Sequence, residues 1–130
     1  MNTMQQEFDA VVAHLYKQGF PAKMGSTSAT SYCAYRGDNG AMCAVGCRIP
    51  DEKYSSKMEG NSLGDLLQYL PGAFTDEIVA YATMFSKLQE VHDQWDFTGY
   101  DASMTWEEYL DVKFPEVAEE FNLTFTKPEA

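Results

Sequence analysis

The sequence is poor in positive charge, and this shortage limits the partners it can bind. Its 130 residues include 9 Lys and Arg against 20 Asp and Glu, which gives a formal net charge of −11. Residues 76–130 hold thirteen acidic and three basic residues, so they contribute −10 of this net charge. Binding to nucleic acid depends on Lys and Arg side chains that replace condensed counterions. We therefore expect no direct binding to DNA or RNA.

The chain also lacks a long hydrophobic run. Its longest apolar stretch, residues 78–85, contains Tyr81 and Thr83, and it is far shorter than the roughly 20 residues that a membrane-spanning helix requires. The first eight residues hold Gln5, Gln6 and Glu7, where a secretory signal would have Lys or Arg ahead of an apolar segment. We therefore expect a cytoplasmic protein without a membrane anchor.

Cysteines are few, and they suggest two interpretations. Cys33, Cys43 and Cys47 are odd in number and do not form the two closely spaced pairs typical of structural zinc sites, so no disulfide framework, metal site or other cofactor is predicted. Reduced cysteines commonly behave as small buried hydrophobic residues. The enzymatic alternative is a nucleophilic Cys33 or Cys43 activated by His92 and Asp93, because a thiol needs a nearby base to become a thiolate. His92 lies on the apolar face of a predicted helix, which is more typical of a buried core histidine.

Most of the sequence has the periodicity of apolar residues that is typical of helices. Apolar residues recur at three- and four-residue spacing behind capping residues, and this pattern predicts helices over residues 3–18, 63–70, 75–95 and 105–121. A proline disfavours helical geometry in the residue before it. We therefore expect Pro115 to break the last helix at Phe114.

One segment has a different pattern. The tetrapeptide Gly37-Asp38-Asn39-Gly40 lies between short β-prone stretches, and it predicts an antiparallel β-hairpin over about residues 32–49. Two strands alone are marginally stable in water, so helices must cover them. The sequence therefore predicts a single helix-dominated α+β domain over residues 1–130, with one hairpin packed on several helices.

A long gapped motif runs through this segment and beyond it. The motif consists of C-A-Y-R-G at 33–37, Gly40, C-A-V-G at 43–46, I-P-D at 49–51, Tyr54 and M-E-G at 58–60, with L-Q at 88–89 and H-D at 92–93. It resembles a family of small uncharacterised proteins of tailed bacteriophages and prophages, over about residues 4–95. The resemblance implies the cytoplasm of an infected bacterium, where small acidic phage proteins often inhibit host enzymes or host defences. It implies no catalytic activity.

Polar residues near the predicted hairpin form a first candidate site. Arg36, Asp51, Tyr54 and Glu59 are expected to lie close together. With the loops at residues 25–31 and 51–60, Arg36 could bind the phosphate or carboxylate of a small, nucleotide-like ligand. The simpler alternative is a structural ion pair of Arg36 with Asp51 or Glu59.

Acidic residues near the C-terminus form a second candidate site. They fall on four-residue spacings and could form a stripe along a helix, which the break expected at Pro115 would interrupt. They are Glu107, Asp111, Glu116 and Glu120. Such residues could mimic phosphates and bind a host protein with a basic surface, or they could simply be a solvated helix face. Our first hypothesis is a phage-type accessory protein that binds and inhibits a host macromolecule through its acidic half. The alternatives are a small-ligand binding protein and a Cys/His-dependent enzyme.

Overall fold

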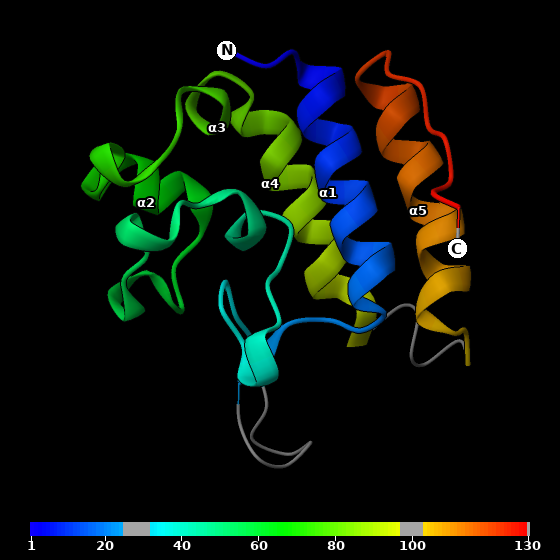
Figure 1. The fold of residues 1–130 in the computed structure, drawn as a ribbon, viewed down its shortest axis with the longest axis horizontal. Coiled ribbons are helices and arrows are strands. Elements are labelled where there is room, and N and C mark those ends of the chain that lie inside the picture. Colours follow the sequence, from blue (N-terminus) through cyan, green and yellow to red (C-terminus); the bar gives the residue numbers. More distant parts are fainter. Residues whose placement is uncertain (25–31, 97–102, 130) are drawn as a thin grey trace.

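Three long helices lie side by side in the computed structural model, which describes residues 1–24, 32–96 and 103–129 (Figure 1). They are α1 (Met4–Gln18), α4 (Ala82–Asp93) and α5 (Trp106–Glu120). Two shorter helices, α2 (Leu63–Tyr69) and α3 (Asp76–Ala80), pack against α4. Single 3-10 turns occupy much of the remaining described chain, at η1 (Asp38–Gly40), η2 (Gly46–Arg48), η3 (Asp51–Lys53), η4 (Ser56–Met58), η5 (Pro71–Ala73) and η6 (Gln94–Asp96). None of the described helices combines the length and the apolar character needed to cross a membrane.

Side-chain caps determine where the helices begin. Each capping hydroxyl accepts a hydrogen bond from the backbone N–H three residues later, and the caps are Thr3, Ser62, Thr75 and Thr105. Gln6 and Glu108 complete reciprocal capping boxes at α1 and α5. These caps confirm the predicted helix starts, because a cap depends only on residues within one turn.

Aromatic side chains join α1, α4 and α5. The Trp106 indole N–H donates to the Leu15 carbonyl at 2.9 Å, which ties α5 to the end of α1. The Tyr109 hydroxyl donates to the Val91 carbonyl of α4. Trp95 packs edge-on against both of these α5 rings, at centroid distances of 5.5 and 5.3 Å. Polar groups on large buried rings thus hold the three helices in a defined register.

A buried ion pair attaches η2 to α1. Glu7 is 1% exposed, and its carboxylate accepts hydrogen bonds from Arg48 Nε at 3.0 Å and Nη2 at 2.8 Å. The Asn2 side chain donates a further bond to Glu7. A fully buried carboxylate requires such partners, since an unpaired charge inside a protein is strongly destabilising.

The predicted hairpin over residues 32–49 is absent, so the α+β prediction is wrong. Strand pairing in the described chain is limited to β1 (Lys23–Met24) with β2 (Tyr32–Cys33) and to one bridge between Arg36 and Met42. Beyond that bridge the two sides separate, because Ala34 N–H donates to the Ala22 carbonyl and the chain after Cys43 turns into η2. Only Val45 and Ile49 among residues 41–49 are β-branched, so the second side has little strand preference.

Two helix boundaries also differ from the sequence-based expectation. The helix predicted over residues 75–95 is divided at Tyr81, whose hydroxyl donates to the Asn2 carbonyl at 2.8 Å. The predicted break at Phe114 does not occur, and α5 continues through Pro115. Phe114, Val117 and Ala118 are buried on the inner face of α5. Their packing against the core outweighs the local preference of proline.

Replacing Pro115 should stabilise the protein. Pro115 has no N–H to donate to the Asp111 carbonyl, and its ring is exposed, so Pro115→Ala restores a hydrogen bond without disturbing the core. We expect the free energy of unfolding to rise by about 1–3 kcal/mol in urea titrations. A decrease would mean that α5 requires the local geometry that proline imposes.

Candidate functional site

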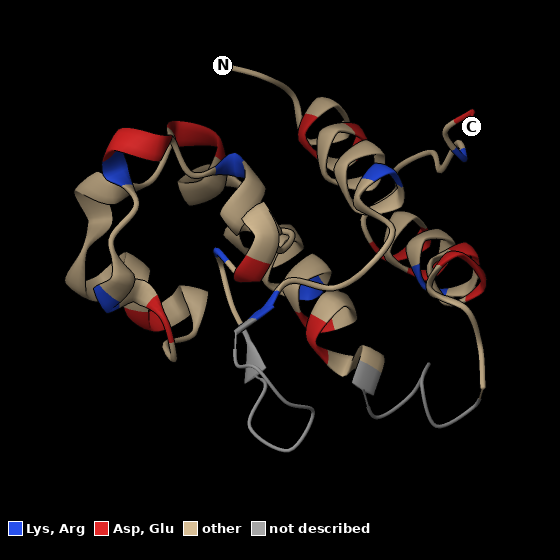
Figure 2. Ribbon diagram, turned by 60° about the horizontal axis from the view of Figure 1, so that its bottom comes forward, with Lys and Arg blue, Asp and Glu red and all other residues tan. Residues whose placement is uncertain are grey.

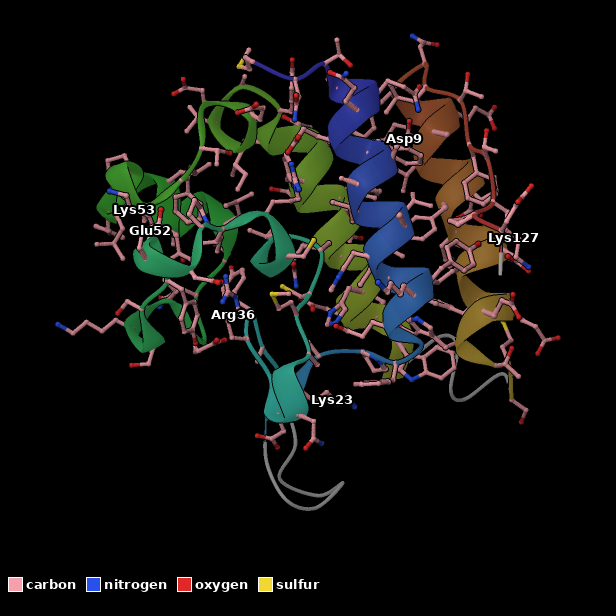
Figure 3. All side chains as sticks on the ribbon, in the orientation of Figure 1. Asp9, Lys23, Arg36, Glu52, Lys53 and Lys127 are labelled. Carbon is pink, nitrogen blue, oxygen red and sulfur yellow. The ribbon has the colours of Figure 1, made fainter. Side chains whose placement is uncertain are left out.

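Arg36 is held by the protein itself. Its Nη1 pairs with Asp51 at 2.9 Å, Nη2 donates to the Ile49 carbonyl at 2.7 Å and Nε donates to the Gly46 carbonyl at 3.3 Å. Its guanidinium also lies over the Tyr54 ring, 5.0 Å from the centroid. Figure 3 shows Arg36 among the turns that follow it in the chain. These contacts correspond to the structural ion pair with Asp51, one of the two alternatives raised by the sequence.

Glu59 binds the same segment from the other side. Its two carboxylate oxygens accept the consecutive backbone N–H groups of Tyr35 and Arg36, at 2.9 and 3.1 Å. The Tyr54 hydroxyl donates to Glu59 at 2.6 Å. Burial, reinforced by the Glu59 carboxylate, raises the pKa of Tyr54 to about 12. We call Arg36, Asp51, Tyr54 and Glu59 the Arg36–Glu59 cluster.

The first candidate site is therefore assembled, but its polar atoms bind one another. All four predicted residues lie together in the Arg36–Glu59 cluster, as their positions along the chain suggested. The donors of Arg36 reach main-chain carbonyls, and the oxygens of Glu59 receive main-chain N–H groups. The cluster can thus satisfy the backbone of turns that have no regular ladder. The other part of that site, the loop at residues 25–31, lies outside the described residues.

Two glycines of the motif allow close backbone approach at this cluster. A Cβ atom at Gly46 would overlap the Tyr35 carbonyl, and one at Gly37 would lie 2.6 Å from the backbone N and O of Lys23. No side chain fits at either position without moving the main chain. The motif residues described so far thus have structural roles.

The thiol and the histidine of the enzymatic alternative have other partners. His92 is fully buried, its Nε2 accepts the Ala22 N–H at 2.8 Å, and its Nδ1 lies 2.8 Å from Asp93 Oδ1. This is the arrangement of a hydrogen-bonded core histidine. Burial raises the pKa of the Cys43 thiol well above its ordinary value, and burial raises the pKa of Cys47 to about 12. The Cys33 side chain lies outside the described part of the structure.

Metal ligands do not converge in the described residues. No group of three His, Cys, Asp or Glu side chains there is arranged to hold an ion. A cleft of about 510 Å³ lies between α4 and the segment before α2, and Glu59, Glu90 and Asp93 contribute to its wall. No Lys or Arg of the described chain lines it. This negative lining is unfavourable for the phosphate of a nucleotide-like ligand.

The acidic residues of the second candidate site do not form one stripe. Because α5 is continuous, Glu107 and Asp111 point about 180° away from Glu116 and Glu120 around its axis. On one side, Lys127 lies 3.0 Å from Glu107 and 3.2 Å from Asp111. On the other side, Glu116 and Glu120 border a hollow shared with Lys87 and Glu90 of α4. The structure thus separates the four predicted residues into two pairs.

Two important contacts were missed by reasoning from sequence. Gln89 accepts the Val45 N–H at 3.1 Å and donates to Asp93 at 2.9 Å, which ties α4 to the turn before η2. The buried pair of Glu7 with Arg48 is the second. A carboxylate next to Phe8 and four residues before Val11, on the edge of an apolar stripe, was the available signal for Glu7. Its partner, 41 residues away, gave none.

Gly46→Ala should disrupt the Arg36–Glu59 cluster. The added methyl overlaps the Tyr35 carbonyl, so the main chain must move and the hydrogen bonds of Arg36 and Glu59 must lengthen. We expect a loss of at least about 2 kcal/mol in the free energy of unfolding. The matched control is Gly64→Ala in α2, where the nearest atom is 3.9 Å away and a gain of up to about 1 kcal/mol is expected. Equal effects of the two changes would contradict the close approach at Gly46.

The thiols of Cys43 and Cys47 should be unreactive in the folded protein. A raised pKa lowers the thiolate fraction at any given pH, and for Cys47 at pH 8 that fraction is about a thousandfold below the unfolded value. Iodoacetamide labelling in a Cys33→Ser background, followed by mass spectrometry, should be slow until denaturant is added. Rapid labelling of native Cys43 would favour the enzymatic alternative.

The chain matches no protein-family model, no curated protein and no solved structure. The resemblance of about residues 4–95 to phage proteins therefore stays a prediction.

Proposed function

We propose that the chain is a non-enzymatic, acidic accessory protein of phage type that binds a host macromolecule with a basic surface and blocks it. The observation that carries this proposal is the charge of α5. Its fifteen residues include six carboxylates and one lysine, Lys113. Figure 2 shows red acidic positions along this helix.

The position of these carboxylates within α5 is unfavourable for the helix. Glu116, Glu119 and Glu120 lie in or next to its last turn, and no basic residue is present in that turn. The C-terminal end of a helix carries a partial negative charge, so each such carboxylate costs roughly 0.3–1 kcal/mol at low salt. Lys113 lies 3.6 Å from Glu116 and offsets part of this cost, but the stability of the helix gives no reason for Glu119 and Glu120. A basic partner would offset this repulsion.

The outward face of α5 suits the side chains of such a partner. Val112 is 48% exposed, and helical spacing places it between Glu108 and Glu119 on one face. Lys and Arg side chains combine a long apolar stem with a cationic end. Their stems can pack on Val112 while their charges approach the carboxylates.

Electrostatics also favours a protein as the partner over nucleic acid. The phosphates of DNA or RNA would be repelled by a surface with a net charge of −11. A basic protein surface would be attracted to it, with an association rate that falls as salt screens the charges. The same acidic surface could keep nucleic acid away from a basic groove that the protein covers.

The other candidate residues give less support to a small-ligand binding protein or a Cys/His-dependent enzyme, because their polar atoms already have partners. The donors of Arg36 and the oxygens of Glu59 bind within the chain. Both ring nitrogens of His92 have partners other than a thiol. The carboxylates at the C-terminal end of α5 are exposed, and of these Glu116 shares only a long 3.6 Å pair with Lys113.

Neutralising the end of α5 should weaken capture of the partner and stabilise the fold. We expect immobilised protein to retain a bacterial host protein at about 0.05 M salt and to release it at about 1 M, where the Debye length is about 3 Å. The variant E116Q/E119Q/E120Q should retain much less of it. Its free energy of unfolding should rise by about 1 kcal/mol, because unfavourable interactions with the helix dipole are removed.

A control variant separates this local effect from net charge. E52Q/D65N/D76N removes the same number of charges from exposed positions outside α5, and it should retain the host protein as the unchanged chain does. Equal loss in both variants would show a dependence on net charge alone. Salt-independent capture, or none at low salt, would refute the proposed function.

A further inference from the structure

The segment after α5 turns back and runs alongside α5 (Figure 1). The groove that it occupies is lined by both α1 and α5, because Gln5 bonds to Thr124 and Lys127 pairs with Glu107. The reversal occurs at Asn122, which has a φ of 56°, and Leu123 N–H donates to the Ala118 carbonyl at 2.7 Å. We call residues 121–129 the strap. Phe121, Leu123 and Phe125 are partly buried and alternate with exposed residues as in an extended peptide, and Pro128 is partly buried as well.

Three sets of contacts fasten the strap. The side-chain amide of Gln5 forms two hydrogen bonds with the backbone of Thr124, each 2.9 Å long. The Phe125 ring lies against Tyr16 and Phe114, at centroid distances of 6.4 and 6.2 Å. Lys127 pairs with Glu107 and Asp111 and lies 5.8 Å from the centroid of the Tyr16 ring. An amide, an aromatic surface and an acidic pair thus follow one another along the groove.

These contacts resemble those of a bound peptide more than those of a core element. After Leu123, no backbone–backbone hydrogen bond links the strap to the rest of the described chain. Lys127 is 44% exposed in its ion pairs, and exposed pairs contribute little net stability. Segments with so few buried contacts open locally without global unfolding.

The groove is also wider than the strap. A cavity of about 450 Å³ lies on one side of it, between Gln5, Asp9 and Thr126. A second cavity of about 650 Å³ lies between Tyr16, Trp106 and Pro128. Larger side chains than those of the strap could enter both spaces.

We propose that this groove is a docking site for an extended peptide segment of the partner, in which an aromatic residue is followed two positions later by Lys or Arg. The strap, with Phe125 and Lys127 at this spacing, occupies the groove as an intramolecular competitor. The proposal rests on the proposed function, and it names the part of the basic partner that Glu107 and Asp111 recognise.

Each part of the groove has a recognition role. Tyr16 and Phe114 form the aromatic surface, and the Tyr16 hydroxyl orients Asp111 through a hydrogen bond of 2.7 Å. This bond, with the nearby Lys127 ammonium, holds the pKa of Asp111 below its ordinary value, so the carboxylate remains charged near neutral pH. While the strap is in place, Lys127 offsets one of the two negative charges of Glu107 and Asp111. Displacement of the strap exposes two negative charges for a cationic side chain.

A labelled peptide with the sequence of residues 121–129 tests the groove in the full-length protein. In the unchanged chain the strap competes at a high effective concentration, so fluorescence anisotropy should detect only weak binding. Lys127→Ala loosens the strap without touching the core, and we expect about tenfold tighter binding of the peptide. Phe125→Ala removes the strap's own ring and leaves Tyr16 and Phe114 free for the peptide, so it should act in the same direction.

Two matched pairs of carboxylates locate the binding site. Adding E107Q/D111N to Lys127→Ala should abolish the gain, whereas E116Q/E120Q, at the same spacing on the opposite side of α5, should leave it. A peptide with alanine at the position of Lys127 should show no gain. Circular dichroism checks that each variant is folded.

The outcomes are distinct from those of the host-protein capture. No gain in peptide affinity with either Lys127→Ala or Phe125→Ala overturns the groove proposal, whatever the capture experiment shows. A gain that E116Q/E120Q removes also overturns it, because the peptide would then bind elsewhere on α5. A gain that requires Glu107 and Asp111 supports the groove even if neutralising Glu116, Glu119 and Glu120 leaves capture unchanged.

Discussion

The carboxylate of Glu59, bound to two consecutive backbone N–H groups, is the interaction on which residues 34–60 depend. This region consists of single 3-10 turns and has no ladder of its own to satisfy its backbone. Arg36 complements Glu59 by donating to the carbonyls of Gly46 and Ile49. Glu59 therefore accepts two N–H groups of this region, Arg36 donates to two of its carbonyls, and both side chains contact Tyr54.

This use of charge explains why the longest motif of the chain is a poor guide to its chemistry. Arg36, Tyr54 and Glu59 would be a plausible ligand site if their polar atoms faced a cavity, yet they bind the main chain and one another. The surface available to partners lies elsewhere, on α5 and beside it. There the carboxylates form two groups, one at the exposed C-terminal end of the helix and one under Lys127 of the strap. The proposed peptide docking and the binding of the strap thus involve the same side of α5, the side of Glu107 and Asp111, whereas Glu116 and Glu120 lie on the other side.

The features that depend on local interactions were predicted correctly from the sequence, and those that depend on non-local interactions were not. The helix starts at Thr3, Ser62, Thr75 and Thr105 follow from capping residues that act within one turn, so sequence reasoning found them. The continuity of α5 through Pro115 depends on packing of its inner face, which outweighs proline's local preference. Non-local contacts also explain why the predicted hairpin is absent. Its turn forms at Gly40, but the Ala34 N–H donates to the Ala22 carbonyl, and the chain after Cys43 turns away from the first side.

The sequence by itself determined the acidic charge, the dominance of helices, the helix starts and the proximity of Arg36 to Asp51 and Glu59, because these depend on composition or on neighbours along the chain. Only the tertiary structure decided that Arg36 and Glu59 bind the backbone. It also decided that His92 Nε2 accepts the Ala22 N–H. Finally, it decided that Lys127 of the strap covers Glu107 and Asp111. The physical reason is that a polar atom's availability depends on every group that reaches it. Partners from 70 residues away, such as Ala22 for His92, leave no signal in the local sequence.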